Sequence, residues 1–354
     1  MGRYSSDPVW EDIVPLPQDD GGPNPLAAIA YPEDYSEAMS YLRAVMANNE
    51  FSDRTLELTE DIIDMNPAHY TVWLYRAKIL LELKKDLREE IQWVNDVALR
   101  HLKNYQIWHH RQLIMDKLDD PTGERAFIAQ MFTLDSKNHH VWTYRQWLVP
   151  RFSLWDSELP DIERLLEEDI RNNSAWNHRW FVVFGRAKLS KEKAASEQTE
   201  TSEALETETL PSSIIDREIT YAQNAILLAP QNQSPWNYLR GILRTTGRPL
   251  ATQAAFAEQF ASLDHPDEVR SSHALDLLAD LYAEEAEGAE GGETGQEKGK
   301  AGEGNAESGK KKAEQALLLL AERYDPIRKG YWLWRRERLG LGEENMATVA
   351  AANA

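Results

Sequence analysis

The sequence contains no cysteine, which excludes disulfide bonds and thiolate metal sites and makes a reducing compartment its natural setting. It also has no apolar run near the roughly 18 residues that a membrane-spanning helix requires. Residues 1–20 lack the apolar core of a secretory signal. We therefore expect no stable membrane insertion and a cytoplasmic location.

Basic residues are scarce as well: the chain holds 39 Lys and Arg against 59 Asp and Glu, a formal net charge of -20. Binding to nucleic acid or to an anionic membrane requires a basic surface field, so we expect neither partner. The motifs of phosphate-binding loops, nucleophile elbows and zinc-binding helices are also missing. We expect no metal site within this chain.

Large apolar side chains are few in two low-complexity stretches, residues 189–211 and 284–312. Such segments cannot offset the entropy lost on ordering, so we interpret them as inserted loops. Residues 1–25, rich in Pro, Asp and Gly, are expected to form a flexible N-terminal segment, and residues 341–354 a C-terminal tail. The folded domain would then span residues 26–340.

Tryptophan, in contrast, is abundant at 12 copies, and its spacing reveals a tandem repeat of the form Asn-x-x-x-Trp-x-x-Arg. The first four repeated tryptophans are 35, 34 and 34 residues apart, and the fifth returns to that period once the first insertion is removed. Each period has room for two helices and two turns. The sequence therefore predicts an all-α fold, a right-handed α–α superhelix of tandem helical hairpins. The units centre on Trp73, Trp108, Trp142, Trp176 and Trp236, with a degenerate sixth near Trp332.

An asparagine precedes four of these tryptophans by four residues, where a helix N-cap is expected. The first unit has His69 in that place, which is a poorer cap. Trp and Arg three residues apart share one helix face, so we interpret both as packing residues. The guanidinium is expected to stack on an aromatic ring or to pair with an acid of the neighbouring repeat. The four predicted caps are Asn104, Asn138, Asn172 and Asn232.

The residue just before the cap is a cation in three consecutive units: Lys103, Lys137 and Arg171. Each would lie at a helix N-terminus, beside unpaired N–H groups and the positive end of the helix dipole. Stacked repeats would align these cations along one edge, as a site for a phosphate or diphosphate. The alternative is that polar turn residues are simply often Lys or Arg.

This repeat resembles that of the protein prenyltransferase α subunits, above all in KNYQIWHHRQ (residues 103–112) and KNHHVWTYRQW (residues 137–147). The resemblance covers about residues 31–340, interrupted by the two insertions. It implies a crescent of hairpins wrapped around a β subunit that carries the catalytic zinc and most of the isoprenoid pocket, with magnesium as a further cofactor. The enzymes, farnesyltransferase and type I geranylgeranyltransferase, transfer an isoprenyl group from its diphosphate to the cysteine of a C-terminal CaaX sequence.

The resemblance also implies roles for individual residues. Lys103 matches the lysine that approaches the diphosphate and stabilises its departing charge. Gln106 matches the glutamine that hydrogen-bonds the terminal carboxylate of the CaaX peptide. His139 departs from the family, which usually has tyrosine there. The implied substrate-binding residues are Tyr70, Tyr105, Gln106, Asn138, His139 and His140.

Two other functions remain open at this point. The chain could be the α subunit of the related Rab geranylgeranyltransferase, or a non-enzymatic helical scaffold that binds partner peptides in its groove. Co-purification separates the three, because an α–α barrel partner with bound zinc indicates an enzyme and a required escort protein indicates the Rab type.

Overall fold

The computed structural model describes residues 2–22, 25–27, 29–186, 210–291 and 300–340. Regular structure in these residues is helical throughout, so the predicted all-α array of helical hairpins is confirmed for them. The chain divides into two compact units, Met1–Glu158 and Leu159–Ala354. No helix among the described residues has the length and apolar character needed to cross a membrane.

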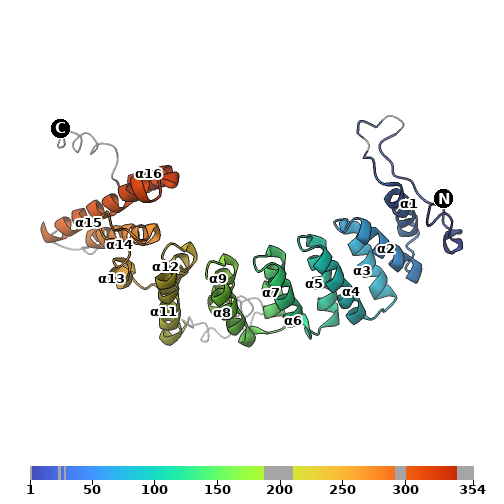
Figure 1. The fold of residues 1–354 in the computed structure, drawn as a ribbon, viewed down its shortest axis with the longest axis horizontal. Helices are drawn as coiled ribbons and strands as arrows, with labels where there is room; N and C mark the ends of the chain where they lie inside the picture. The colour runs from blue at the N-terminus through green and yellow to red at the C-terminus, as the bar shows by residue number, and fades with distance from the viewer. Residues whose placement is uncertain (1, 23–24, 28, 187–209, 292–299, 341–354) are drawn as a thin grey trace, which may run out of the picture. The chain divides into compact units, whose positions relative to one another are not determined.

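Unit 1 is built from consecutive pairs of helices, seen side by side in Figure 1. Within the pairs α2 packs on α3, α4 on α5 and α6 on α7, and between pairs α3 packs on α5 and α5 on α7. The second helices of successive hairpins are therefore neighbours. The bounds are α1 Glu33–Ala47, α2 Asp53–Met65, α3 Tyr70–Glu82, α4 Leu87–Arg100, α5 Tyr105–Leu118, α6 Glu124–Leu134 and α7 His139–Arg151, with 3-10 turns Pro8–Trp10 and Trp155–Ser157.

Unit 2 is also built from helices, of which α14 and α15 are the longest at 20 residues each. Two helices of this unit end in π-helical segments: Phe181–Gly185 extends α9, and Leu320–Tyr324 extends α15. The bounds are α8 Glu158–Glu168, α9 Asn173–Trp180, α11 Ser212–Leu228, α12 Gln233–Thr246, α13 Ala254–Ala257, α14 Ser272–Gly291, α15 Lys300–Leu319 and α16 Lys329–Arg338, with 3-10 turns Leu250–Gln253 and Pro326–Arg328.

The prediction of a loop at residues 284–312 is wrong for the described part of this range, which belongs to α14 and α15. These two helices pack closely, because the residues between them are small. Ala286 is buried, and a Cβ on Gly309 would lie only 2.9 Å from the Tyr282 carbonyl oxygen. A composition poor in large side chains here permits close helix contact. Residues 189–209 and 341–354, the rest of the expected insertion and tail, lie outside the described residues.

The prediction that residues 1–25 are flexible is wrong for residues 3–16, which fold against α1 and α2. Trp10 is 5% exposed and lies 5.6 Å, ring centre to ring centre, from both Tyr4 and Tyr41. Arg54 of α2 donates to the Val9 carbonyl at 2.6 Å. These aromatic contacts bury enough apolar surface to order the segment, although its Pro, Asp and Gly content predicted flexibility.

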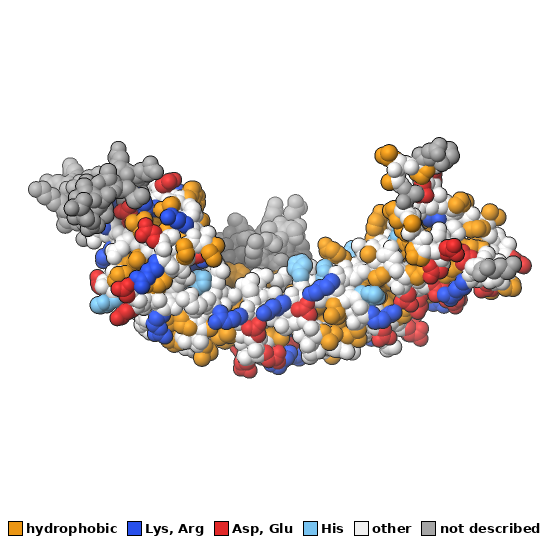
Figure 2. All heavy atoms as spheres, turned by 45° about the horizontal axis from the view of Figure 1, so that its top comes forward, with side chains coloured by type: hydrophobic (Ala, Val, Ile, Leu, Met, Phe, Trp, Pro, Cys, Tyr) orange, Lys and Arg blue, Asp and Glu red, His pale blue; other side chains and the backbone are white. Residues whose placement is uncertain are grey.

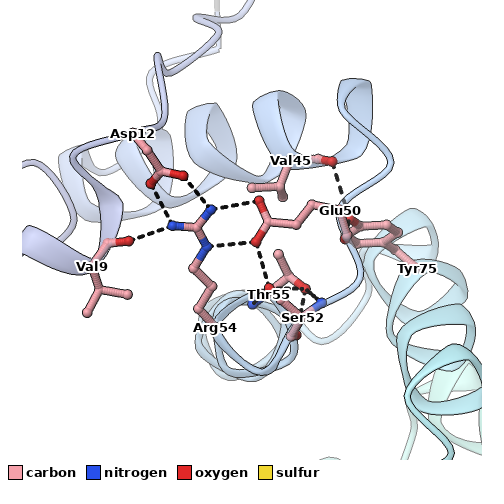
Figure 3. Close-up of polar contacts among 8 residues, drawn as sticks. All are labelled: Val9, Asp12, Val45, Glu50, Ser52, Arg54, Thr55 and Tyr75. Carbon is pink, nitrogen blue, oxygen red and sulfur yellow. Dashed lines mark hydrogen bonds and ion pairs between the residues drawn. The ribbon is translucent and has the colours of Figure 1, made fainter.

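Figure 3 shows how Arg54 ties this segment to the first repeat. Its guanidinium lies between two carboxylates, donating to Asp12 at 2.7 and 2.9 Å and to Glu50 at 2.7 and 2.9 Å. The planar guanidinium suits two bidentate pairs at once. The N-terminal segment thus covers α1 and α2, the first two helices of the chain.

We predict that Trp10→Ala lowers the free energy of opening of this segment by about 3 kcal/mol, the lower end for a buried tryptophan. Hydrogen exchange checks this at the Leu16 amide, which donates to the Ser40 carbonyl at 3.0 Å. The matched control is Val9→Ala, because the Val9 side chain is largely exposed. Equal exchange in the two variants would contradict the packing role of Trp10.

The repeated tryptophans are buried, and four of them are anchored to the turn before their own helix. The indole N–H donates to the carbonyl oxygen six residues earlier at 2.8 to 2.9 Å. The ring therefore packs between hairpins while its N–H holds the turn that carries the predicted caps. The four donors are Trp73, Trp142, Trp176 and Trp236.

Buried ion pairs join each hairpin to the next, as the sequence predicted for the repeat arginines. Each arginine lies on the second helix of one hairpin, and its Nε donates to a glutamate on the first helix of the next at 2.7 to 2.9 Å. Each glutamate stands 18 residues before the tryptophan of its own repeat. The pairs are Arg76–Glu90, Arg111–Glu124, Arg145–Glu158 and Arg179–Glu218.

A further donor on the glutamate's own repeat completes these networks. His110 lies 2.7 Å from Glu90, and the hydroxyls of Tyr144 and Tyr238 donate to their glutamates at 2.6 and 2.8 Å. Burial acts to raise the pKa of the Glu90 carboxyl, but hydrogen bonds from His110 and Arg76 outweigh it, and the pKa is lowered. The carboxylate therefore stays charged inside the protein.

The fifth unit departs from this scheme. The buried Leu239 stands three residues after Trp236, where the other units have arginine. Arg240, one residue later, instead pairs with Asp276 and Asp280 of α14, as does Arg335 of α16. The fifth repeat is thus joined to the helices that follow it by a partly exposed cluster of charges.

We predict that Arg111→Met destabilises the chain by about 3–5 kcal/mol, because Glu124 would be left buried without its cation. The control is Arg88→Met, which breaks the exposed pair with Asp120 and should cost far less. Urea denaturation of the full chain checks both. Similar midpoints for the two variants would contradict a structural role for the buried pair.

Candidate functional site

The residues singled out by the sequence lie at the first turns of α3, α5 and α7, all in unit 1. We call this surface the N-terminal edge and define it as residues 69–70, 103–106 and 135–140. Because α3 packs on α5 and α5 on α7, the three turns are neighbours. Tyr70, Tyr105 and His139 occupy the same position in three successive repeats, three residues before the tryptophan.

The predicted asparagine caps are confirmed. The Asn104 side-chain oxygen accepts from the Gln106 N–H at 2.8 Å, and that of Asn138 accepts from the His140 N–H at 3.0 Å. Asn172 and Asn232 cap α9 and α12 in the same way. His69 makes no side-chain cap bond at the start of α3, as expected. The caps fix where each first turn begins, and so where the side chains of the edge lie.

Asn138 does more than cap α7, and this corrects its predicted role. It is 0% exposed, and its Nδ2 donates to the Leu102 carbonyl of the preceding repeat at 2.7 Å. With its oxygen used by the cap and its nitrogen by the neighbouring turn, the amide has no surface for a substrate. The prediction that Asn138 faces the substrate is therefore wrong for this structure.

Lys103 lies immediately before the cap of α5 with its side chain 69% exposed. Its ammonium pairs with the carboxylate of Asp135 in the next repeat. The hydrogen bond from Lys103 is the largest cause of a lowered pKa at Asp135, so this acid is charged. The lysine is thus held at the edge by a contact between two repeats.

Tyr105 and His140 lie beside this lysine. The Tyr105 side chain is exposed, and its ring centre is 4.7 Å from that of His140. Burial, followed by the charges of His139 and Lys103, lowers the pKa of His140. The imidazole is therefore biased toward its neutral form, which can donate from one nitrogen and accept at the other. The structure brings Lys103, Tyr105 and His140 together across α5 and α7.

The other predicted residues surround this group. Gln106 is half-buried in the first turn of α5, and His139 is exposed, its ring centre 5.8 Å from that of His140. Tyr70 is exposed one repeat earlier, on α3. All three occupy positions from which a ligand at the edge could be contacted.

Asp135 is the residue of the N-terminal edge that the sequence pattern did not single out. A signal was available, since an aspartate stands seven residues before the tryptophan in this repeat, in the fourth at Asp169 and in the sixth at Asp325. The cations of the predicted row therefore alternate with acids. On the face displayed in Figure 2, Asp and Glu side chains lie among those of Lys and Arg. Lys137 belongs to unit 1 and Arg171 to unit 2.

No group of three or more His, Asp or Glu side chains among the residues that the structure describes is placed to hold a metal ion. The chemistry available at the edge is that of a cation paired with a carboxylate, a phenol, an imidazole and an amide. Together these groups suit an anionic ligand with a polar neighbour.

A sequence model described as protein prenyltransferase alpha subunit repeat matches the chain five times, at residues 52–83, 87–118, 121–152, 155–185 and 215–246. Each match contains one of the five predicted tryptophans. The protein farnesyltransferase/geranylgeranyltransferase type-1 subunit alpha of Candida albicans is 35% identical over 342 residues, which cover 93% of this chain and 97% of that protein. The chain belongs to the protein prenyltransferase α subunit family.

Two further relatives agree with this membership. The protein farnesyltransferase/geranylgeranyltransferase type-1 subunit alpha of Schizosaccharomyces pombe is 49% identical over 235 residues, covering 66% of this chain and 72% of that protein. A solved structure, described as Candida albicans protein geranylgeranyltransferase-I complexed with GGPP, matches with a TM-score of 0.74 and 33% identity. That match covers 93% of this chain and 97% of the other. The resemblance seen in the repeat motif is confirmed.

We predict that Asn138→Ala destabilises the chain by about 2 kcal/mol, because it removes a helix cap and a buried bond between repeats. The matched variant Asn104→Ala removes a half-exposed cap and should cost about 1 kcal/mol. Thermal or urea denaturation measures the difference. A smaller loss at Asn138 than at Asn104 would show that its bond to Leu102 contributes nothing.

Proposed function

We propose that this chain is the α subunit of a heterodimeric CaaX protein prenyltransferase, active only with a β subunit. The reaction would transfer a farnesyl or geranylgeranyl group from its diphosphate to the cysteine of a C-terminal CaaX sequence. The observation that carries the proposal is the exposed, paired Lys103 at the N-terminus of α5. The names of the relatives favour this class over the Rab-type α subunit and over a non-enzymatic scaffold.

Lys103 would act on the leaving group. As the cysteine thiolate forms a bond to the first carbon of the isoprenyl chain, the bond from that carbon to the diphosphate oxygen breaks and negative charge grows on the diphosphate. An ammonium group and the positive end of a helix dipole both stabilise such charge. In this proposal the chain contributes electrostatic stabilisation and no covalent chemistry.

A partner is needed because Lys103 is open to water in this chain. Charge interactions across water are weak, and they strengthen when a site is closed and water is excluded. A β subunit covering the N-terminal edge would supply that closure. Zinc on the β subunit and magnesium with the diphosphate are part of the proposal, and no step at either metal is assigned to residues of this chain.

The peptide would lie along the same edge. Gln106 carries an amide that can donate a hydrogen bond to the terminal carboxylate of a CaaX peptide. Tyr105, His140, His139 and Tyr70 supply rings and polar groups on either side of it. The expected cytoplasmic location stays a prediction.

We predict that Lys103→Ala in the heterodimer lowers the rate of the chemical step by about 100-fold, the lower end of the range found for removal of one charge-stabilising donor. Heterodimer formation should be unchanged, because the Lys103 side chain is mostly exposed. Single-turnover kinetics with farnesyl diphosphate and a CaaX peptide measure the rate.

The matched control is Lys117→Ala, which removes an exposed lysine from the last turn of the same helix. It should leave the rate unchanged. Unaltered turnover in Lys103→Ala would refute the proposed role of the lysine. Failure of the chain to co-purify with an α–α barrel partner would refute the heterodimer.

A further inference from the structure

We propose that Asp135 is a positioning residue for the diphosphate site, which holds the Lys103 ammonium at the N-terminal edge and offsets part of its charge. The inference rests on the proposed function of Lys103. It assigns a role in that site to a residue of the following repeat, in the turn between α6 and α7.

The Asp135 carboxylate is held in place by its own turn. One side-chain oxygen accepts from the Lys137 N–H at 3.0 Å, and the other pairs with Lys103. The backbone N–H of Asp135 donates to the Met131 carbonyl at 3.0 Å and so ends α6. The turn is also anchored at Ser136, whose carbonyl accepts from the Trp142 indole at 2.9 Å.

The two partners differ in how firmly they are placed. The side chain of Asp135 is 25% exposed and bonded on both oxygens, whereas that of Lys103 is 69% exposed. A lysine carries four rotatable carbon–carbon bonds and a strongly hydrated ammonium group, so by itself it samples many positions. A fixed counter-ion restricts it to those near Asp135. The turn is thus the rigid member, and the lysine is the member that is oriented.

The residues beside the pair support an orienting role. His140 follows the same turn, and its ring lies against Tyr105, two residues after Lys103. Because burial biases His140 toward its neutral form, it adds no second cation that would compete with Lys103 for the Asp135 carboxylate. The carboxylate and the two rings together hold the ammonium beside the N-terminus of α5.

Such a counter-ion has two opposite effects on a diphosphate. It weakens binding, because part of the ammonium charge is already neutralised. It assists the chemical step, because the cation is already oriented where charge grows on the leaving group and little reorganisation is needed. A residue with only a structural role would change neither quantity through Lys103.

The test is Asp135→Asn in the full heterodimer. The amide oxygen of asparagine can still accept from the Lys137 N–H, so the turn is kept while the charge is removed. We expect the dissociation constant for farnesyl diphosphate to fall by about two- to fivefold, the range for loss of a competing surface ion pair. The single-turnover rate with a CaaX peptide should fall by about three- to tenfold as the ammonium loses its fixed orientation.

A double-mutant cycle shows whether the effect acts through the lysine. In a Lys103→Ala background, Asp135→Asn should change neither the dissociation constant nor the rate. The matched control is Asp120→Asn. Asp120 lies on the α5–α6 loop, away from the edge, where its side chain accepts from the backbone N–H two residues later and pairs with Arg88. This variant should leave both constants unchanged. Asp135→Ser, which also keeps an oxygen for the Lys137 N–H, carries the same test where the Asn variant fails to assemble.

The outcomes separate this inference from the proposed function. If Lys103→Ala slows the reaction but Asp135→Asn acts equally with and without Lys103, the positioning role is overturned and the lysine's role stands. The positioning role is also overturned if Asp135→Asn changes neither constant. If Lys103→Ala leaves turnover unchanged, the proposed function of the lysine itself fails.

Discussion

The buried arginine–glutamate pair between successive hairpins is the constraint on which the rest of this structure depends. Both charges lose their hydration on burial, so the pair is tolerated only where its geometry is nearly ideal. Planar, two-point contact between guanidinium and carboxylate meets this condition. Apolar packing alone would allow adjacent hairpins to slide or rotate. The added bonds from His110, Tyr144 and Tyr238 to the same glutamates restrict the hairpins further.

The geometry of the N-terminal edge follows from that constraint. Within unit 1 the arginine pairs fix the middle of each second helix against the first turn of the next hairpin, and the Asn138–Leu102 bond fixes two successive turns against each other. The first turns of α5 and α7 therefore lie side by side. Lys103 of one repeat is consequently placed beside Asp135 of the next, although 32 residues separate them. A site made of side chains from two repeats thus depends on charges buried away from it.

The sequence predicted those parts that depend on local spacing. The repeat period, the caps and the packing role of the tryptophans and arginines each follow from residues a few positions apart, and they are confirmed. Contacts between repeats are harder to predict. Nothing near Asn138 indicates that its amide is buried against Leu102. The aspartate that recurs seven residues before the tryptophan does not by itself indicate Lys103 as the partner of Asp135. Composition misled where packing was unusual, as with Trp10 and the close approach at Gly309.

The proposed site has a rigid part, whose contacts lie within the chain, and an exposed part that a partner could cover. The caps, the indole anchors and the buried ion pairs are satisfied within the chain, so they need nothing further to hold the edge in shape. Lys103, Tyr105 and Tyr70 instead keep most of their surface open. In water an exposed ammonium discriminates poorly between anions, because solvent screens it. Its pairing with Asp135 retains the charge in a defined position, and covering the edge would then convert that position into selective stabilisation of a leaving diphosphate.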